Sequence, residues 1–216
     1  IGEFEVEFLP VTHSVPEAFA ASYSCDAGTI FHTGDFKIDH SPVDGRRTDL
    51  ARIGEIASTK QIDLLLSDST GAERPGTTGS ESSVRISIDR IFHEHRDQRV
   101  IVSTFASHIH RMIQIIESAF QQDRKIAFLG RSIHTNIAIA REQGLLTFDD
   151  RSLIDIEDVD NYQPHEVCVI CTGSQGEPLS ALSLIASGQS RFLSVDENDC
   201  IVLSSHTIPG NETGVN

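Results

Sequence analysis

The sequence predicts an α/β protein with a mainly parallel sheet, and its apolar pattern is the basis for that class. In the later part of the chain, short apolar runs alternate with segments whose apolar residues recur at helical spacing. The earlier part contains runs in which apolar and polar residues alternate, as in half-buried strands. Regular alternation of strands and helices is typical of a parallel sheet that is covered by helices on both faces.

The first third of the chain is predicted to consist mostly of strands. Residues 3–11 form the first strand, and residues 19–24 and 29–32 form two more, joined by the turn Asp26-Ala27-Gly28. A short helix over residues 48–56 and a compact apolar strand over residues 62–67 follow.

The composition changes near Gly71, where a loop rich in Gly and Pro begins. Thr78 and Glu81 form a capping-box pattern that opens the next helix. We therefore expect two domains, residues 1–73 and residues 74–216. The second domain should contain strands at residues 100–103, 125–129, 167–171 and 201–203, and helices marked by Ile88, Ile109, Ile133 and, at its first position, Pro178.

Length and charge limit the classes of function. The chain has 216 residues, 38% of them hydrophobic, which is enough for a sizeable core. No apolar run reaches membrane-spanning length, so no membrane partner is expected. The net charge of −15 argues against non-specific binding of nucleic acid but does not exclude a nuclease, whose metal ions supply local positive charge. The acidic run from Asp149 to Glu166 is predicted to be a solvated connector.

The cysteines point to a reducing compartment rather than to a zinc site. Cys168 and Cys171 have C-x-x-C spacing but lie in an apolar strand, and no second pair completes a metal site. With Cys25 and Cys200, they are predicted to be reduced thiols of a cytoplasmic protein. Because the chain runs from Ile1 to Asn216 without an initiating Met, we expect an internal piece of a longer protein.

Three residues at predicted strand ends are candidate metal-site residues: His13, Asp35 and Asp68. An imidazole nitrogen and a carboxylate oxygen are ligands that catalytic metals accept, and an Asp can bridge two ions. Gly34 permits a tight backbone that would aim Asp35 inward. We expect the side chains of His13 and Asp35 to converge on one metal site.

Other histidines fit metal binding less well. The segment from His93 to Asp97 has part of an H-x-H-x-D-H pattern, but it ends an amphipathic helix and is predicted to be a solvated helix end. His108 and His110 open a helix, where capping, surface contact or substrate contact fits better than metal. His40 is predicted to lie on the surface.

Polar residues follow four strands of the second domain, and in a parallel sheet they meet at the carboxyl edge, where such sheets bind ligands. Each group by itself also fits ordinary turn and cap chemistry, but the four together favour a ligand site. Backbone N–H groups of the Gly-rich third group could bind a phosphate. The four groups are residues 104–108, 130–132, 172–177 and 204–206.

Several stretches resemble the β-CASP nucleases of the metallo-β-lactamase superfamily, and among them the ribonuclease J family. They occur in the family's order over nearly the whole chain. They are Thr12-His13-Ser14-Val15-Pro16, His32-Thr33-Gly34-Asp35-Phe36-Lys37, Leu66-Ser67-Asp68-Ser69-Thr70, Thr104-Phe105-Ala106-Ser107, Gly130-Arg131-Ser132, Thr172-Gly173-Ser174-Gln175-Gly176-Glu177-Pro178 and Ile208-Pro209-Gly210-Asn211-Glu212.

The resemblance implies a fold and a reaction. The fold is part of a metallo-β-lactamase αββα sandwich, followed by a β-CASP domain that clamps single-stranded RNA over the metal cleft. The reaction is hydrolysis of RNA phosphodiesters, 5′ to 3′ and also internally, in RNA processing and decay. Two divalent metal ions are implied, zinc first, with manganese or magnesium as alternatives. Full-length members also imply a homo-oligomer.

The resemblance also implies roles for individual residues. His13 is similar to a metal ligand, Asp35 to the Asp that bridges two metals, and Asp68 to a catalytic acid that orients neighbouring histidines. Phe105 is an aromatic on which a base could stack. The expected RNA-binding residues are Ser107, His108, Arg111, Arg131, Ser132, Ser174, Gln175 and His206.

Two departures and two alternatives qualify this resemblance. The family's H-x-H-x-D-H segment should precede residue 1 and its later histidine motifs should follow residue 216, so the chain alone should bind metal weakly. His206 stands where an Arg is expected. The alternatives are a small-ester or thioester hydrolase, which would not need the segment from residue 74 onward, and a non-catalytic RNA-binding scaffold.

Overall fold

The computed structural model describes residues 2–208 and 210–215, without the side chains of Glu212 and Val215. Ile1, Asn216 and Pro209 of the Ile-Pro-Gly-Asn-Glu stretch lie outside the described residues. The chain forms two compact units, Ile1–Val84 and Arg85–Asn216. This division falls inside helix α2 (Glu81–Glu94), later than the predicted boundary between residues 73 and 74.

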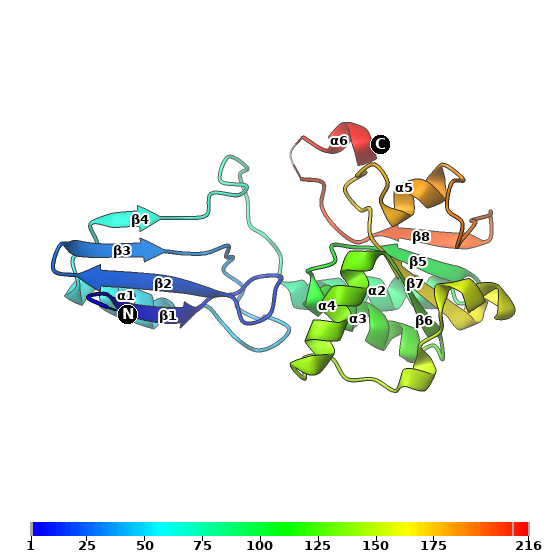
Figure 1. Cartoon of the computed structure of the whole chain (residues 1–216), viewed down its shortest axis with the longest axis horizontal. Helices are drawn as coiled ribbons and strands as arrows, with labels where there is room; N and C mark the ends of the chain where they lie inside the picture. Colours follow the sequence, from blue (N-terminus) through cyan, green and yellow to red (C-terminus); the bar gives the residue numbers. More distant parts are fainter. Residues whose placement is uncertain (1, 209, 216) are drawn as a thin grey trace. The chain divides into compact units, whose positions relative to one another are not determined.

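The first unit is a four-stranded sheet in the order β1-β2-β3-β4 (Figure 1). Its strands are β1 (Glu5–Pro10), β2 (Phe19–Cys25), β3 (Gly28–His32) and β4 (Leu64–Leu66). The first three pair antiparallel, and β3 pairs parallel with β4, so β3 and β4 end at the same edge. That shared edge positions the residues that follow both strands.

Among the described residues of the first unit, a helix covers one face of the sheet. Helix α1 (Leu50–Thr59) places Ile56 against Leu9 and Phe31 on that face. The opposite face carries large side chains that are between 39% and 59% exposed: Phe8, Phe19, Tyr23, Ile30, Leu64 and Leu66. A continuous exposed apolar face is what one layer of a sandwich presents to its partner layer, which fits the predicted αββα architecture.

The second unit is a four-stranded parallel sheet in the order β6-β7-β5-β8. Its strands are β5 (Arg99–Ser103), β6 (Lys125–Leu129), β7 (Val167–Cys171) and β8 (Asp199–Leu203). Strand β7 is buried along its whole length, because apolar residues on both of its faces meet helices or turns. The α/β class and the parallel sheet are confirmed.

Helices lie on both sides of the second sheet (Figure 1). Helix α5 (Ala181–Ala186) and the 3₁₀ segment Ile156–Asn161 contribute Ile185 and Val159 to the apolar cluster on one face. The amphipathic helices α2, α3 (Ile109–Phe120) and α4 (Arg131–Glu142) bury their apolar stripes against the sheet. A short helix, α6 (Glu212–Val215), is the last element. Within the described residues, no helix is both long and apolar enough to cross a bilayer.

Three local predictions are corrected by the structure. Helix α2 begins at Glu81 rather than after Thr78, because the Glu81 N–H donates to the Asp39 carboxylate 3.0 Å away. Helix α5 begins at Ala181 rather than at Pro178, with Ser180 as its N-cap. The segment 149–166 is not only a connector: it contains three 3₁₀ turns, and its apolar residues cover the sheet while its acids face solvent.

Candidate functional site

The backbone of the first unit brings the segment around residue 13 beside the loop after β3. Thr12 and Lys37 form an isolated antiparallel bridge, in which the Lys37 N–H donates to the Thr12 carbonyl oxygen over 2.9 Å. The hydroxyl of Thr48, just before α1, accepts from the Thr12 N–H at 3.0 Å. Residues 12–13 are thereby fixed next to residues 35–37.

His13 and Asp35 converge as the sequence predicts. His13 Nε2 lies 3.9 Å from Asp35 Oδ2. Two atoms that bind one ion at about 2.1 Å lie roughly 3 to 4 Å apart, so this pair fits adjacent ligands of one metal. Gly34 has a φ of +62°, and an added Cβ there would come within 2.8 Å of the Phe19 carbonyl oxygen, so glycine is required at this position.

The inward orientation of Asp35 stays a prediction. The Asp35 side chain is 79% exposed, whereas that of His13 is 30% exposed. An exposed carboxylate facing a half-buried imidazole leaves one side of the pair open to further ligands.

Asp68 is held at the same sheet edge, because β4 runs parallel to β3. The Asp68 N–H donates to Thr33 Oγ1 at 2.9 Å, which ties the two loops together. The pKa of Asp68 is lowered, mainly by hydrogen bonds from the N–H and hydroxyl of Thr70. Desolvation opposes this shift, whereas the Phe36 N–H and the charge of His13 add to it. The carboxylate is therefore an anion that is already hydrogen-bonded, which suits orienting its neighbours better than binding metal directly.

Within the part of the chain that the structure describes, no group of three His, Cys, Asp or Glu side chains could hold a metal ion. The segment from His93 to Asp97 ends α2, as predicted, with His95 Nδ1 paired to Gln98 at 2.5 Å. Burial raises the pKa of both Cys168 and Cys171 to about 12, so these thiols stay protonated. The described residues thus supply the pair His13 and Asp35, but not a complete ligand set.

Asp39 is a buried carboxylate that sequence reasoning missed. Desolvation alone would raise its pKa, but hydrogen bonds from the N–H groups of Ser41 and Glu81, with Ser80 and Lys37, outweigh it and lower the pKa to about 2. The Asp-x-Ser spacing from Asp39 to Ser41 is an Asx-turn pattern and was the available signal. Asp39 joins the loop after the Asp35 motif to the start of α2.

Replacing Asp39 with Asn is expected to lower the free energy of unfolding by about 2 kcal/mol at pH 7, because a pKa lowered on folding stabilises the folded state. This contribution is present above a pH of about 4 and is lost as the pH falls toward 2. Urea unfolding at pH 7 and at pH 2.5 measures it. The same change at Asp26, an exposed turn residue, is the control. An equal loss at both pH values would contradict the assignment.

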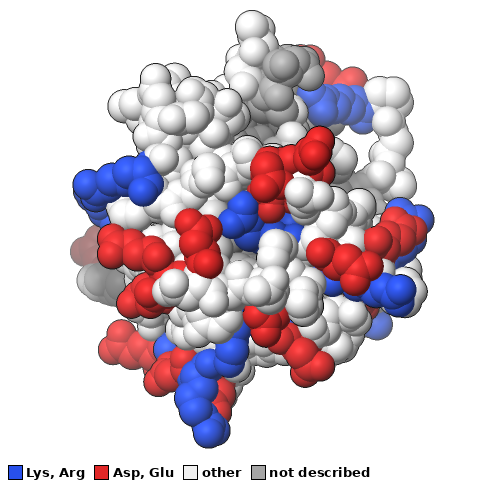
Figure 2. All heavy atoms as spheres, turned by 90° about the vertical axis from the view of Figure 1, so that its right-hand side faces the viewer, with Lys and Arg blue, Asp and Glu red and all other residues white. Residues whose placement is uncertain are grey.

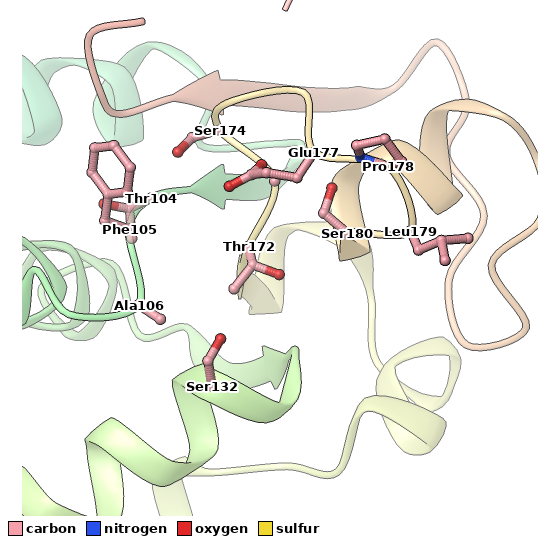
Figure 3. A pocket seen from close by; sticks show the side chains of 11 residues that line it. Thr104, Phe105, Ala106, Ser132, Thr172, Ser174, Glu177, Pro178, Leu179 and Ser180 are labelled. Atoms are coloured by element: carbon pink, nitrogen blue, oxygen red, sulfur yellow. The ribbon is translucent and has the colours of Figure 1, made fainter. Parts of the chain in front are cut away.

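At the carboxyl edge of the second sheet, three of the four predicted polar groups surround one cavity (Figure 3). The cavity has a volume of about 310 Å³, within the range of small-ligand pockets. Its lining includes hydroxyls from three strand ends, the Phe105 ring and the Glu177 carboxylate, but no Lys or Arg. The buried hydroxyl of Thr104 has no hydrogen-bond partner among the described atoms. The hydroxyl-bearing residues are Thr104, Ser132, Thr172, Ser174 and Ser180.

The structure brings only two of the predicted RNA-binding residues, Ser132 and Ser174, into this cavity. His108 caps α3 instead, accepting from the Arg111 N–H through Nδ1. The Arg111 guanidinium donates to the carbonyl and hydroxyl oxygens of Ser204, both at 2.8 Å. The remaining exposed members of the predicted set lie outside the cavity: Ser107, Arg131 and His206.

Gln175 is only 3% exposed, and its side chain forms hydrogen bonds to residues 205–208. Its Nε2 donates to Ser205 Oγ and to the His206 carbonyl oxygen, and its Oε1 accepts from the Ile208 N–H at 2.7 Å. A side chain used in this way is not available to RNA. Gly176 beside it has a φ of +67°, and a Cβ there would lie 2.1 Å from the Gly214 carbonyl oxygen. The Gly-rich loop therefore holds the last described segment in place.

The loop ends in a strained turn that sequence reasoning also missed. The Ser180 N–H donates to the Glu177 carbonyl oxygen at 3.1 Å, which places Pro178 and Leu179 at the centre of the turn. Leu179 has a φ of +66°. Pro followed by a residue with positive φ is the type II pattern, in which Gly or Asn is preferred. A Leu in this region costs about 1–2 kcal/mol.

Comparison with known proteins decides the family. The family model described as the β-CASP domain of ribonuclease J matches residues 97–216. The chain belongs to the ribonuclease J family.

Curated relatives named ribonuclease J match nearly the whole chain. The relative from Helicobacter pylori (strain B128) is 45% identical over 215 residues, covering 100% of this chain and 31% of the relative. The relative from Mycobacterium tuberculosis (strain CDC 1551 / Oshkosh) is 46% identical over 214 residues, covering 99% of this chain and 38% of the relative. The chain thus spans about a third of the length of these relatives.

A solved structure shares the fold. The crystal structure of a protein of unknown function from Enterococcus faecalis V583 aligns with a TM-score of 0.57 at 16% identity. The alignment covers 100% of this chain and 56% of that chain. At this identity the likeness supports the fold alone.

Proposed function

We propose that this chain is the central part of a metal-dependent ribonuclease that hydrolyses single-stranded RNA 5′ to 3′ and also internally. The observation that carries the proposal is the approach of His13 Nε2 to within 3.9 Å of Asp35 Oδ2 at a shared strand edge, in a member of the ribonuclease J family. An oligomeric, cytoplasmic full-length protein acting in RNA processing and decay is part of the proposal.

The chain's own residues supply part of a metal site. His13 offers Nε2 and Asp35 offers a carboxylate to two divalent ions, zinc first and manganese or magnesium as alternatives. When bound, such ions activate water and neutralise charge on the scissile phosphate. Asp68 keeps its negative charge next to the pair and fixes the loop through Phe36 and Thr70. The remaining ligands must come from outside the described residues.

The cavity of the second unit is suited to a nucleoside rather than to a phosphate. It is lined by the Glu177 carboxylate and by no Lys or Arg, which disfavours a bound anion. The Phe105 ring offers a stacking surface for a base, and accessible hydroxyls such as those of Ser132 and Thr172 can bond a ribose or a base edge. Figure 2 shows acidic and basic side chains interspersed on the face that it draws, without a continuous basic patch in the described part of that face. At the cavity itself, which has an aromatic ring and no Lys or Arg in its lining, stacking should contribute more than general charge attraction.

The full-length protein should degrade a 5′-monophosphorylated single-stranded RNA to mononucleotides and also release internal fragments. Chelation should abolish both activities, and adding back zinc, manganese or magnesium in turn should identify the metal. Gel analysis of RNA labelled at either end separates the two modes. Cleavage that persists after chelation, or no cleavage with any of the three metals, would refute the proposal.

The 216-residue chain by itself is expected to bind zinc weakly and to cleave RNA poorly, because its described residues supply only two ligands of a site that needs more. Calorimetric titration with zinc and a cleavage assay beside a full-length relative measure this. A cleavage rate close to that of the relative would show that the chain's own residues suffice.

A further inference from the structure

Leu179 has the most exposed side chain among the large hydrophobic residues that the structure describes, at 81% exposure. It also occupies the strained third position of the turn from Glu177 to Ser180, with a φ of +66°. Glycine or asparagine would adopt that backbone more easily. Leucine here therefore costs stability and gains no packing within the described chain, so folding does not account for its presence.

The turn itself is firmly held. The Glu177 carbonyl oxygen accepts from the Ser180 N–H at 3.1 Å and from the Ser183 hydroxyl at 2.9 Å. The hydroxyl of Ser180 also caps α5, accepting from the Ser183 N–H. These bonds fix the backbone on both sides of Leu179 and leave its side chain exposed.

Leu179 lines the same cavity as Phe105, and Figure 3 shows the two residues at opposite ends of the labelled group. Hydroxyl groups, including that of Thr172, lie between them. A nucleotide matches this pattern, because its base has apolar faces and its sugar and base edges have hydrogen-bonding groups. An exposed apolar side chain on a hydrogen-bonded turn at the rim is suited to pack against such a base.

We propose that Leu179 is a positioning residue for RNA, packing against a nucleoside of the bound strand at the end of the cavity opposite Phe105. This inference rests on the proposed function. Leu179 lies away from His13 and Asp35 in the sequence and belongs to the other unit, and it has no group that could take part in hydrolysis. Its loss should therefore weaken binding more than it slows the chemical step.

The test uses the full-length protein with Leu179→Gly, Leu179→Asn and Leu179→Met. Both Gly and Asn remove the apolar contact and suit the turn, and Met restores an apolar side chain of similar size. We expect Gly and Asn to raise the KM for a short single-stranded RNA by roughly tenfold, the effect of losing one buried apolar contact. We expect kcat to change less than about twofold. Fluorescence anisotropy in an Asp35→Ala background, where cleavage is prevented, should show the same loss of affinity.

Melting temperatures of the variants should equal or exceed that of the unmodified protein, since the strain at position 179 is relieved. Met should restore KM to near the unmodified value, which a purely structural role of the turn would not predict. If the unmodified protein binds RNA and the Gly and Asn variants bind equally well, this inference is wrong while the proposed function stands. If the unmodified protein binds no RNA, both fail.

Discussion

Replacing Asp35 with Ala in the full-length protein is expected to reduce RNA cleavage by roughly a thousandfold or more while leaving the fold intact. The effect is large because the proposed metal site loses the carboxylate that faces His13 Nε2 at 3.9 Å. The fold should be unaffected because the Asp35 side chain is 79% exposed and packs against no core residue. Initial rates on a labelled RNA and thermal unfolding measure the two effects.

A matched variant separates the effect of losing the Asp35 charge from the effect of losing its side-chain size. Asp35→Asn keeps the size of the side chain and removes its negative charge, so it should lose nearly as much activity as Asp35→Ala. Asp26→Ala removes an exposed acid from the β2–β3 turn of the same sheet and should leave the rate unchanged. If the Asp35 variant still cleaves RNA, Asp35 does not belong to the site. If cleavage is absent even before substitution but RNA still binds, the non-catalytic scaffold becomes the better interpretation.

Much of the fold was predictable because hydrophobic periodicity reports burial directly. The fully apolar run of β7 gave a strand buried on both faces, and the apolar stripe of α3 gave a helix against the sheet. It was also predictable that the loops after β3 and β4 lie close together. Residues that follow strands collect at one sheet edge, and Asp35 and Asp68 do so because these two strands run parallel.

The turns and polar contacts were less predictable, because they depend on partners distant in the sequence. Pro178 has the residue type of a helix start, but Leu179 adopts a positive φ, which ends any helix there and delays α5 to Ala181. The acidic run after Asp149 is dominated by charge, yet Val159 within it is only 2% exposed. Gln175 resembles a surface amide, and only the fold supplies its partners at residues 205–208.

The two edges of the second sheet are built differently. At the amino edge, Arg99 pairs with Asp199 through two hydrogen bonds of 2.8 and 2.7 Å, which lock β5 to β8. The same edge holds the fully buried Arg124. At the carboxyl edge lie the cavity and the Thr104 hydroxyl, which has no hydrogen-bond partner in the described part of the chain. These buried arginine contacts thus lie at the edge opposite the candidate ligand site, as expected when the ligand edge must stay open.

Arg124 is expected to be the most costly side chain to remove. It is 2% exposed, and its guanidinium donates at 2.7–3.2 Å to four carbonyl oxygens, those of His95, Arg96, Gln98 and Val167. It also lies over the Phe92 ring, 5.5 Å from the centroid. Arg124→Met fills similar space but leaves the four carbonyls without these donors, two of them just beyond the end of α2. We expect the free energy of unfolding to fall by roughly 3–5 kcal/mol.

Urea unfolding of the 216-residue chain measures this loss, and two further variants define its cause. Arg90→Met makes the same chemical change on α2 at a side chain that is 69% exposed, and should alter stability by less than about 0.5 kcal/mol. Arg124→Lys retains the charge but cannot reach four acceptors in one plane, so it should recover only part of the loss. If Arg124→Met costs less than about 1 kcal/mol, water or local rearrangement replaces the lost donors, and the hydrogen bonds contribute little net stability.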